Sequence, residues 1–219
     1  MVAVIDYDAG NIRSVMNALR LLGQEAVTTR DAAVILSADH VILPGVGAFG
    51  EAMERIRTYG LEPVIREVTE RGTPFLGICL GQQILFEESE ETPGVRGLGI
   101  FKGICRRIPE GEERKIPQIG WNDLSYPRAG RLFNGVPEHS YVYFVHSYYV
   151  VPADPLVVTA VTEYGAPLTA SVEQGNVFAC QFHPEKSAEV GQQILKNFLS
   201  VRNGSACGKG TEEKRISGC

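Results

Sequence analysis

The sequence has no long hydrophobic run and no marked targeting segment. No apolar stretch in the 219 residues reaches the ~18 that a membrane-spanning helix needs. Residues 1–6 pass directly into an apolar, strand-like pattern, without the basic segment that opens a secretory signal. We therefore expect a protein that neither crosses a membrane nor is secreted.

Positive charge and cysteine are also scarce. The 21 Lys and Arg are outnumbered by 26 Asp and Glu, so the net charge is -5 and no basic surface for nucleic acid is expected. The five cysteines are odd in number and widely scattered, which argues against a disulfide framework. No His/Cys cluster has the spacing of metal ligands. We expect a cytoplasmic protein with no metal or cofactor and with at least one thiol available for chemistry.

The first ~90 residues alternate between strand and helix patterns. At 44% hydrophobic residues, the chain is long enough for one sizeable core. This alternation predicts an α/β fold with a mostly parallel central sheet flanked by helices. The expected strands span 2–6, 25–29, 41–43 and 74–78; the expected helices span 15–22, 50–71 (broken near Gly60 and Pro63) and 80–88.

After Pro93 the pattern changes to short strands with frequent turn residues. Their alternating polarity predicts antiparallel strands at the edge of the sheet, followed by a helix over 189–200. We expect one domain over residues 1–202 and a poorly ordered tail over 203–219, which is rich in Gly, Ser, Lys and Glu. The expected edge strands span 100–105, 140–151, 157–162, 168–172 and 177–182.

A candidate nucleophile lies between a predicted strand and a predicted helix. The segment Gly77-Ile-Cys79-Leu-Gly81 has the form G-x-C-x-G, in which small residues allow the sharp turn of a nucleophile elbow. Such a turn presents the cysteine alone at the carboxyl end of the sheet. The dipole of the following helix favours the thiolate. Cys79 is thus the predicted nucleophile, whereas Cys105 and Cys180 lie in apolar strands and are expected to be inert.

A thiolate nucleophile needs a base, and His183 is the best candidate. In Phe182-His-Pro-Glu185, residues 183 and 185 would face the same side of an extended segment, with Pro184 stiffening the spacing. Glu185 could then hold the imidazole in one tautomer, as in other catalytic triads. The sequence therefore predicts a Cys79–His183–Glu185 triad.

Attack on an amide also requires donors for the tetrahedral oxyanion. One source is the N–H of Leu80, directly after the nucleophile. The other is the loop Pro44-Gly45-Val46-Gly47, which ends a predicted strand and whose glycines allow close approach and reorientation of a peptide.

These motifs together resemble class I, or triad-type, glutamine amidotransferases. The strongest similarity is to the glutaminase subunits of imidazole glycerol phosphate synthase. The matching segments are 5–7 with 10–11, Leu43-Pro-Gly-Val-Gly-Ala-Phe49, Gly77-Ile-Cys-Leu-Gly-Gln-Gln83, Ile116-Pro-Gln-Ile-Gly-Trp-Asn122, Phe144-Val-His-Ser-Tyr148 and Gln181-Phe-His-Pro-Glu-Lys-Ser187.

The resemblance implies roles for further residues. It implies Val46 and Leu80 as oxyanion donors and implies that ammonia passes to a (β/α)8-barrel cyclase, which forms imidazole glycerol phosphate in histidine biosynthesis. The implied substrate-binding residues are Gly45, Gly47, Gln83, His146, Ser147 and Tyr148; those implied at the partner interface or ammonia exit are Gln118, Trp121 and Lys186.

The resemblance also implies that glutamine is hydrolysed well only when the partner is docked. A flip of the peptide near Gly45 and Val46 would be a suitable switch, so a β-branched residue at 45 should abolish partner-stimulated turnover. One departure from the family is Asp8 in place of a glycine, and Asp tolerates a positive φ better than most residues.

Three other functions remain open at this point. The partner could be a synthase for vitamin B6, anthranilate or carbamoyl phosphate, although Lys186 and the Gly120-Trp-Asn122 segment argue against these. A free-standing cysteine hydrolase, such as a γ-glutamyl peptidase, would be active with no partner. A non-catalytic binding protein would not need the three triad residues together.

Overall fold

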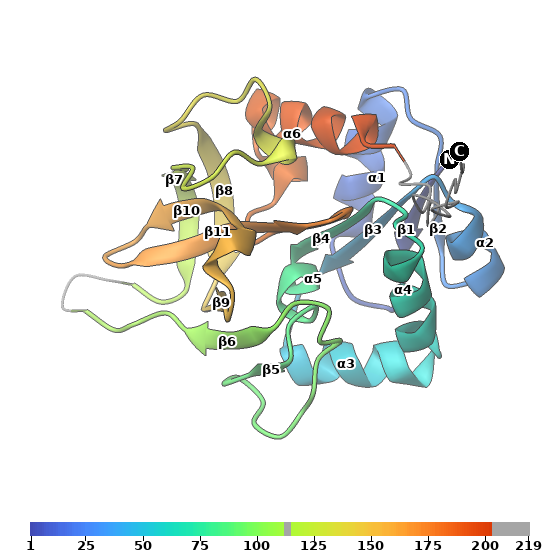
Figure 1. The fold of residues 1–219 in the computed structure, drawn as a ribbon, viewed down its shortest axis with the longest axis horizontal. Coiled ribbons are helices and arrows are strands. Elements are labelled where there is room, and N and C mark those ends of the chain that lie inside the picture. The colour runs from blue at the N-terminus through green and yellow to red at the C-terminus, as the bar shows by residue number, and fades with distance from the viewer. Residues whose placement is uncertain (112–114, 203–219) are drawn as a thin grey trace, which may run out of the picture.

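The fold of this chain is described from a computed structural model over residues 1–111 and 115–202. The tail predicted over 203–219 lies outside these residues. Within the described ranges, no helix has both the length and the apolar character needed to cross a bilayer. The predicted α/β architecture is confirmed: a large central sheet carries helices on both faces (Figure 1).

The first half of the sheet is parallel and carries the predicted site at its carboxyl end. In space the strands run in the order β2, β1, β3, β4, β12, and every neighbouring pair is parallel. Because β4 pairs with both β3 and β12, three segments far apart in sequence end side by side. The bounds are β1 Val2–Ile5, β2 Ala26–Thr29, β3 His40–Gly45, β4 Phe75–Cys79 and β12 Val177–Cys180.

Alternate residues of these buried strands enter two different cores. Val2 and Val4 pack with helices α1 and α6, whereas Ala3 and Ile5 pack on the opposite face with α2, α3 and α4. This is the two-residue side-chain period of a strand that is covered on both faces. The helices are α1 Ile12–Leu21, α2 Ala32–Ser37, α3 Phe49–Thr58, α4 Leu61–Glu70, α5 Leu80–Gln83 and α6 Ala188–Ser200.

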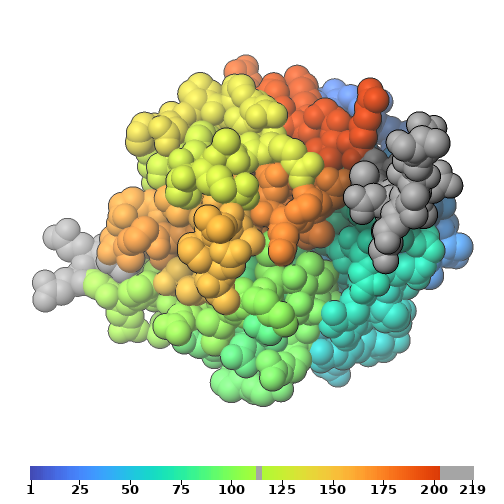
Figure 2. All heavy atoms as spheres, viewed as in Figure 1, coloured from blue at the N-terminus to red at the C-terminus, as the bar shows by residue number. Residues whose placement is uncertain are grey.

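The second half extends the sheet with mainly antiparallel strands, as predicted. β11 pairs antiparallel with β12, and β9 and β6 continue the sheet toward β5. Figure 2 shows this half, in green to orange, beside the blue and teal helices of the first half. The bounds are β5 Glu88–Ser89, β6 Gly103–Arg107, β9 Tyr148–Pro152, β10 Val158–Glu163 and β11 Pro167–Gln174.

Two strand predictions need correction. The strand expected over 140–151 is two strands that break at Ser147: β8 (Tyr141–His146) leaves the main sheet, and β9 remains in it. The partner of β8 is β7 (Gln118–Asp123), which sequence analysis missed and which pairs antiparallel to form a separate two-stranded sheet. β7 contains Gly120 and polar residues, so it has no apolar run that would mark a strand.

The helix predictions hold with three changes. Gly60 does break the 50–71 helix, with a left-handed φ of 66, but Pro63 lies in the first turn of α4, where proline is tolerated. The helix predicted over 80–88 ends at Gln83, and α2 was not predicted. The short 3-10 turns are η1 Arg131–Phe133, η2 Pro155–Val157 and η3 Pro184–Lys186.

Candidate active site

Cys79 forms the predicted nucleophile elbow. It ends β4 and precedes α5 with φ 57 and ψ -111, a conformation that is strained for a residue with a side chain. Small neighbours make the turn possible. A Cβ added at Gly81 would lie 1.9 Å from the carbonyl oxygen of Leu43, and one at Gly77 would lie 2.7 Å from that of Gly81. The glycines of the G-x-C-x-G segment are therefore needed for packing.

His183 lies beside the elbow because it follows β12, the direct neighbour of β4. Its Nδ1 is 2.8 Å from Oε1 of Glu185, and both side chains are buried. The backbone between them differs from the prediction. Residues 184–186 form the 3-10 turn η3 and do not continue an extended segment. The tight turn brings the carboxylate back to the ring, so the expected pair forms by a different local geometry.

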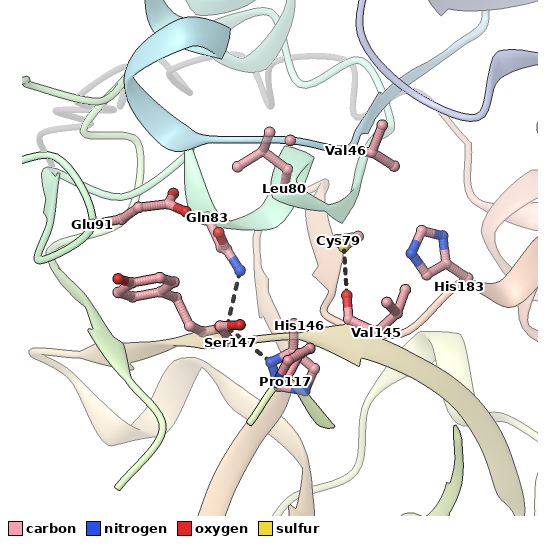
Figure 3. Close-up of a pocket in the computed structure, with 12 residues that line it drawn as sticks. Val46, Cys79, Leu80, Gln83, Glu91, Pro117, Val145, His146, Ser147 and His183 are labelled. Atoms are coloured by element: carbon pink, nitrogen blue, oxygen red, sulfur yellow. Dashed lines mark hydrogen bonds between the residues drawn. The ribbon is translucent and has the colours of Figure 1, made fainter. Parts of the chain in front are cut away.

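The electrostatic environment favours a charged imidazole. Burial lowers the pKa of His183, but Cys79 and Glu185 together raise it more strongly, to about 9. Nε2 of His183 has no hydrogen-bond partner within the described part of the chain. Figure 3 shows this ring beside the cysteine, across the same cavity. A protonated imidazole near the sulfur is the arrangement expected of an activated thiolate.

The sulfur of Cys79 has a donor that sequence analysis missed. Nε2 of Gln181 lies 3.6 Å from Sγ, and Oε1 of the same side chain accepts from Nε2 of Gln83 at 3.0 Å. Gln83 also donates to the carbonyl oxygen of Tyr148 at 3.0 Å. The position of Gln181 at the end of a buried strand, two residues before His183, was the available signal.

The elbow and the imidazole open onto one cavity of about 290 Å³. The cavity is lined by both predicted oxyanion residues, Val46 and Leu80, and by five of the six predicted substrate residues. Sequence analysis did not assign Glu91, Pro117 or Val145 to it. The full lining is Val46, Gly47, Cys79, Leu80, Gln83, Glu91, Pro117, Val145, His146, Ser147, Tyr148 and His183 (Figure 3).

Gly45 is the predicted substrate residue that does not line this cavity. It is buried at the end of β3, paired with Cys79. A Cβ there would lie 2.5 Å from the hydroxyl oxygen of Tyr7 and 2.8 Å from the backbone nitrogen of Gly81. A β-branched residue at 45 would therefore clash with its surroundings, and loss of activity in that variant cannot by itself demonstrate a peptide flip.

His146 and Gln118 form a buried pair at the edge of the cavity. Burial lowers the pKa of His146 to about 4, so its ring is neutral at pH 7. Nδ1 lies 2.8 Å from the carbonyl oxygen of Tyr148 and Nε2 lies 3.0 Å from Oε1 of Gln118, and the neutral ring donates its single N–H to one of these two oxygens. Gln118, expected at the partner interface, is only 3% exposed. It supports His146 from within and offers no docking surface.

Trp121 and Lys186 meet at the ring of Tyr143. Trp121 packs edge-on against this ring with centroids 6.1 Å apart, and Nζ of Lys186 is 5.9 Å from its centre. Trp121 is 52% exposed, so it is not an ordinary core residue. The neighbouring positions Ile119 and Tyr141 are also more than half exposed. We refer to Ile119, Trp121, Tyr141 and Tyr143 as the aromatic patch.

Two further cysteines, Cys105 and Cys180, and the family departure at Asp8 are as predicted. Cys105 and Cys180 are free and buried, and burial raises the pKa of both thiols, which keeps them protonated. No group of His, Cys, Asp and Glu in residues 1–111 and 115–202 could hold a metal ion. Asp8 has φ 59, the positive value anticipated for it. Its carboxylate binds Arg30 at 2.6 Å and Tyr59, and its backbone carbonyl accepts from Arg55.

With this geometry in place, the chain can be compared with known proteins. The family description for class I glutamine amidotransferases matches residues 3–201. The chain belongs to this family. The amidotransferase shares its fold with PurLQS from Thermotoga maritima, at a TM-score of 0.69 and 24% identity over 90% of this chain and 96% of that one. A second solved structure, that of a glutamine amidotransferase, gives a TM-score of 0.71 over 91% of this chain and 97% of that one, at 24% identity.

Curated relatives give a finer grouping for this amidotransferase. The imidazole glycerol phosphate synthase subunit HisH of Moorella thermoacetica is 51% identical over 90% of this chain and 93% of its own length. The subunit of the same name from Methanothermobacter thermautotrophicus is 47% identical over 92% of this chain and 98% of its own. At this identity and coverage, the amidotransferase is a member of the HisH group, and the resemblance stated from its motifs is confirmed.

Proposed function

We propose that this amidotransferase hydrolyses the side-chain amide of L-glutamine and delivers the ammonia to a synthase subunit in histidine biosynthesis. The observation that carries the proposal is that Cys79 and His183 open onto one cavity, with Glu185 bonded to the far side of the imidazole. The similarity to HisH subunits supports the pathway.

The first half of the reaction forms a thioester. The thiolate of Cys79 attacks the carboxamide carbon, and the carbonyl oxygen becomes an oxyanion that accepts from the N–H groups of Val46 and Leu80. Leu80 is the first residue of α5, so its N–H has no partner within that helix. His183, held protonated, gives its proton to the leaving nitrogen, the C–N bond breaks and ammonia departs.

The second half releases glutamate. His183, now neutral, takes a proton from a water that attacks the thioester carbon, and the same N–H groups hold the second oxyanion. The C–S bond breaks, which restores the thiolate and the imidazolium. Glu185 remains ionised throughout and stabilises the imidazolium, as the carboxylate does in other triads.

One carboxamide group and one carboxylate group in the cavity are suited to bind the amino-acid end of glutamine. Gln83 resembles the family residue that grips this end, and it lines the cavity together with Glu91. Oε2 of Glu91 is fixed by the backbone N–H of Phe49 at 2.7 Å. We assign the carboxylate of Glu91 to the α-ammonium group of the substrate, because opposite charges attract and Glu91 is the one carboxylate among the described residues that line the cavity.

The aromatic patch is the proposed docking surface for the partner, which we identify with a (β/α)8-barrel cyclase. Exposed Trp and Tyr are common anchors of protein interfaces. The patch is also connected to the triad, since the backbone N–H of His183 donates to the carbonyl oxygen of Tyr143 at 2.9 Å. Lys186, directly after the triad carboxylate, is proposed to face the ammonia exit. A partner bound to β8 would therefore be linked to the backbone of His183 through one hydrogen bond.

The decisive experiment measures glutamate formation with and without the barrel cyclase and its ribotide ligand. We expect strong stimulation of the wild type by the loaded cyclase and none of Cys79→Ser. Cys180→Ala is the matched control, because it removes a buried thiol from the neighbouring strand and should stay active. Activity of Cys79→Ser would overturn the assignment of the nucleophile.

The same assay separates the other functions. A free-standing γ-glutamyl hydrolase would turn over at full rate with no partner. An amidotransferase for another pathway would respond to a different synthase, which a pull-down would identify. A non-catalytic binding protein would bind the cyclase and release no glutamate under any condition.

A further inference from the structure

The hydroxyl of Tyr7 is buried and unpaired. Tyr7 lies in the loop between β1 and α1, its side chain is fully buried, and its oxygen has no hydrogen-bond partner within residues 1–111 and 115–202. Buried polar groups nearly always have a partner, so an exception calls for a physical explanation. Packing alone does not provide it, because phenylalanine would fill the same space without the unpaired oxygen.

This hydroxyl lies where the oxyanion loop meets the elbow. The Cβ position of Gly45 is 2.5 Å from the Tyr7 oxygen, 2.8 Å from the backbone nitrogen of Gly81 and 2.9 Å from Cβ of Leu80. The Tyr7 oxygen is therefore no more than about 4 Å from Cα of Gly45, given a carbon–carbon bond of ~1.5 Å. The negative charge of Cys79 contributes, after burial, to the raised pKa of this phenol, which is consistent with their proximity.

The hydroxyl nevertheless makes no bond to the carbonyl oxygen of Gly45. That carbonyl is therefore not hydrogen-bonded to Tyr7, although the Cα of Gly45 is nearby. Val46 lines the cavity and Tyr7 does not. Rotation of the peptide between Gly45 and Val46 changes the direction of its C=O and N–H groups together. A rotation that turns the Val46 N–H toward the substrate would therefore also redirect the Gly45 carbonyl, which is the nearest backbone acceptor on this peptide for the Tyr7 hydroxyl.

We propose that Tyr7 is a positioning residue for the oxyanion hole, whose hydroxyl lacks an acceptor in the resting loop and donates to the Gly45 carbonyl once the Gly45–Val46 peptide has turned. The bond would stabilise the conformation in which Val46 can hold the oxyanion. The inference rests on the proposed glutaminase function. It adds a side chain outside the cavity that stabilises the turned conformation of the Gly45–Val46 peptide.

The test is Tyr7→Phe, which removes only the hydroxyl and introduces no clash, unlike a substitution at Gly45. Glutaminase kinetics are measured with and without the barrel cyclase and its ribotide ligand. We expect the ratio of stimulated to unstimulated kcat to fall about 10-fold, because the turned loop loses a hydrogen bond and the resting loop no longer carries an unpaired donor. KM for glutamine should change by less than about twofold, since Tyr7 does not line the cavity.

Two further readouts separate positioning from a general structural effect. The rate at which iodoacetamide alkylates Cys79 should stay at the wild-type value, and the thermal midpoint should be unchanged or higher. The matched control is Tyr126→Phe, which removes a hydroxyl that donates to the carbonyl of Pro137 at 3.3 Å, away from the cavity. This control should keep the wild-type stimulation ratio.

Each outcome decides between the alternatives. An unchanged stimulation ratio in Tyr7→Phe overturns the proposal, and so does an equal loss of stimulated and unstimulated rates with a lowered thermal midpoint. If the wild type itself is not stimulated by the cyclase, it is the proposed partner that fails. That result is seen before any Tyr7 variant is compared.

Discussion

The buried ring of His146 should make this protein sensitive to acid. Its pKa in the folded state is about 4, against an ordinary value of 6.5, because burial and the positive charge of His183 disfavour a second cation. The unfolded chain therefore binds a proton at this site before the folded chain does. By linkage, the free energy of unfolding falls as pH drops below about 6.5 and stops falling below about 4.

The size of the effect follows from the shift. A difference of about 2.5 pKa units corresponds to about 3 kcal/mol when fully developed, and about 2 kcal/mol of this should be lost between pH 7 and pH 4.5. The perturbation is His146→Gln, whose neutral amide keeps a polar group near the position of Nε2 but cannot take up a proton. Because carboxylates titrate in both proteins, their contribution cancels when the two are compared.

The assay is urea unfolding of wild type and His146→Gln at pH 7 and pH 4.5, followed by circular dichroism. The wild type should lose about 2 kcal/mol more than the variant over this interval. His146→Asn serves as a second variant if the longer amide does not fit. Equal losses in wild type and variants would refute the depressed pKa and, with it, the assignment of a neutral ring beside the imidazolium of His183.

Three further predictions concern the triad, the elbow and the patch. Glu185→Gln should lower the pKa of His183 from about 9, seen by NMR titration, because one of the two groups that raise it is lost, and kcat should fall by roughly 10²–10⁴. Gly81→Ala should destabilise the protein by at least ~1–3 kcal/mol in urea unfolding, since its Cβ would overlap the Leu43 carbonyl; unchanged stability would contradict the close packing of the elbow. Trp121→Ala should weaken partner binding by more than ~1 kcal/mol in calorimetry and change stability by less than ~0.5 kcal/mol, and wild-type affinity would exclude Trp121 as an anchor.

Features that depend on a single short segment of the chain could be predicted from the local sequence pattern. The elbow could be predicted because an apolar strand, two glycines and a cysteine occur within a few residues, and the structure bears this out at φ 57 for Cys79. The helix break at Gly60 was also predictable, because a single glycine within the segment allows the left-handed backbone conformation that ends the helix. The strand Gln118–Asp123 was not, since its pairing with β8 and not its own composition makes it a strand.

The surroundings of individual residues were less predictable than the positions of the helices and strands. Gln118, implied at the partner interface or ammonia exit, is buried against His146, and Gly45, implied as a substrate residue, is packed against Tyr7. Gln181 lies in a segment that resembles the family but had no role assigned, and no local motif marks Glu91, although both contribute to the site. Whether a polar residue faces a cavity, a neighbour or solvent depends on which strands become adjacent.

By itself, the sequence determined the α/β architecture and the sharp turn that places Cys79 at the carboxyl end of β4, because hydrophobic period and glycine spacing act over a few residues. The group of relatives followed from the motifs that the chain shares with them. Only the tertiary structure decided that β12 lies next to β4, so that a histidine about a hundred positions away lines the same cavity as Cys79. It also decided the charge states of His183 and His146. Burial and neighbouring charges fix a pKa, and both are properties of the packed molecule.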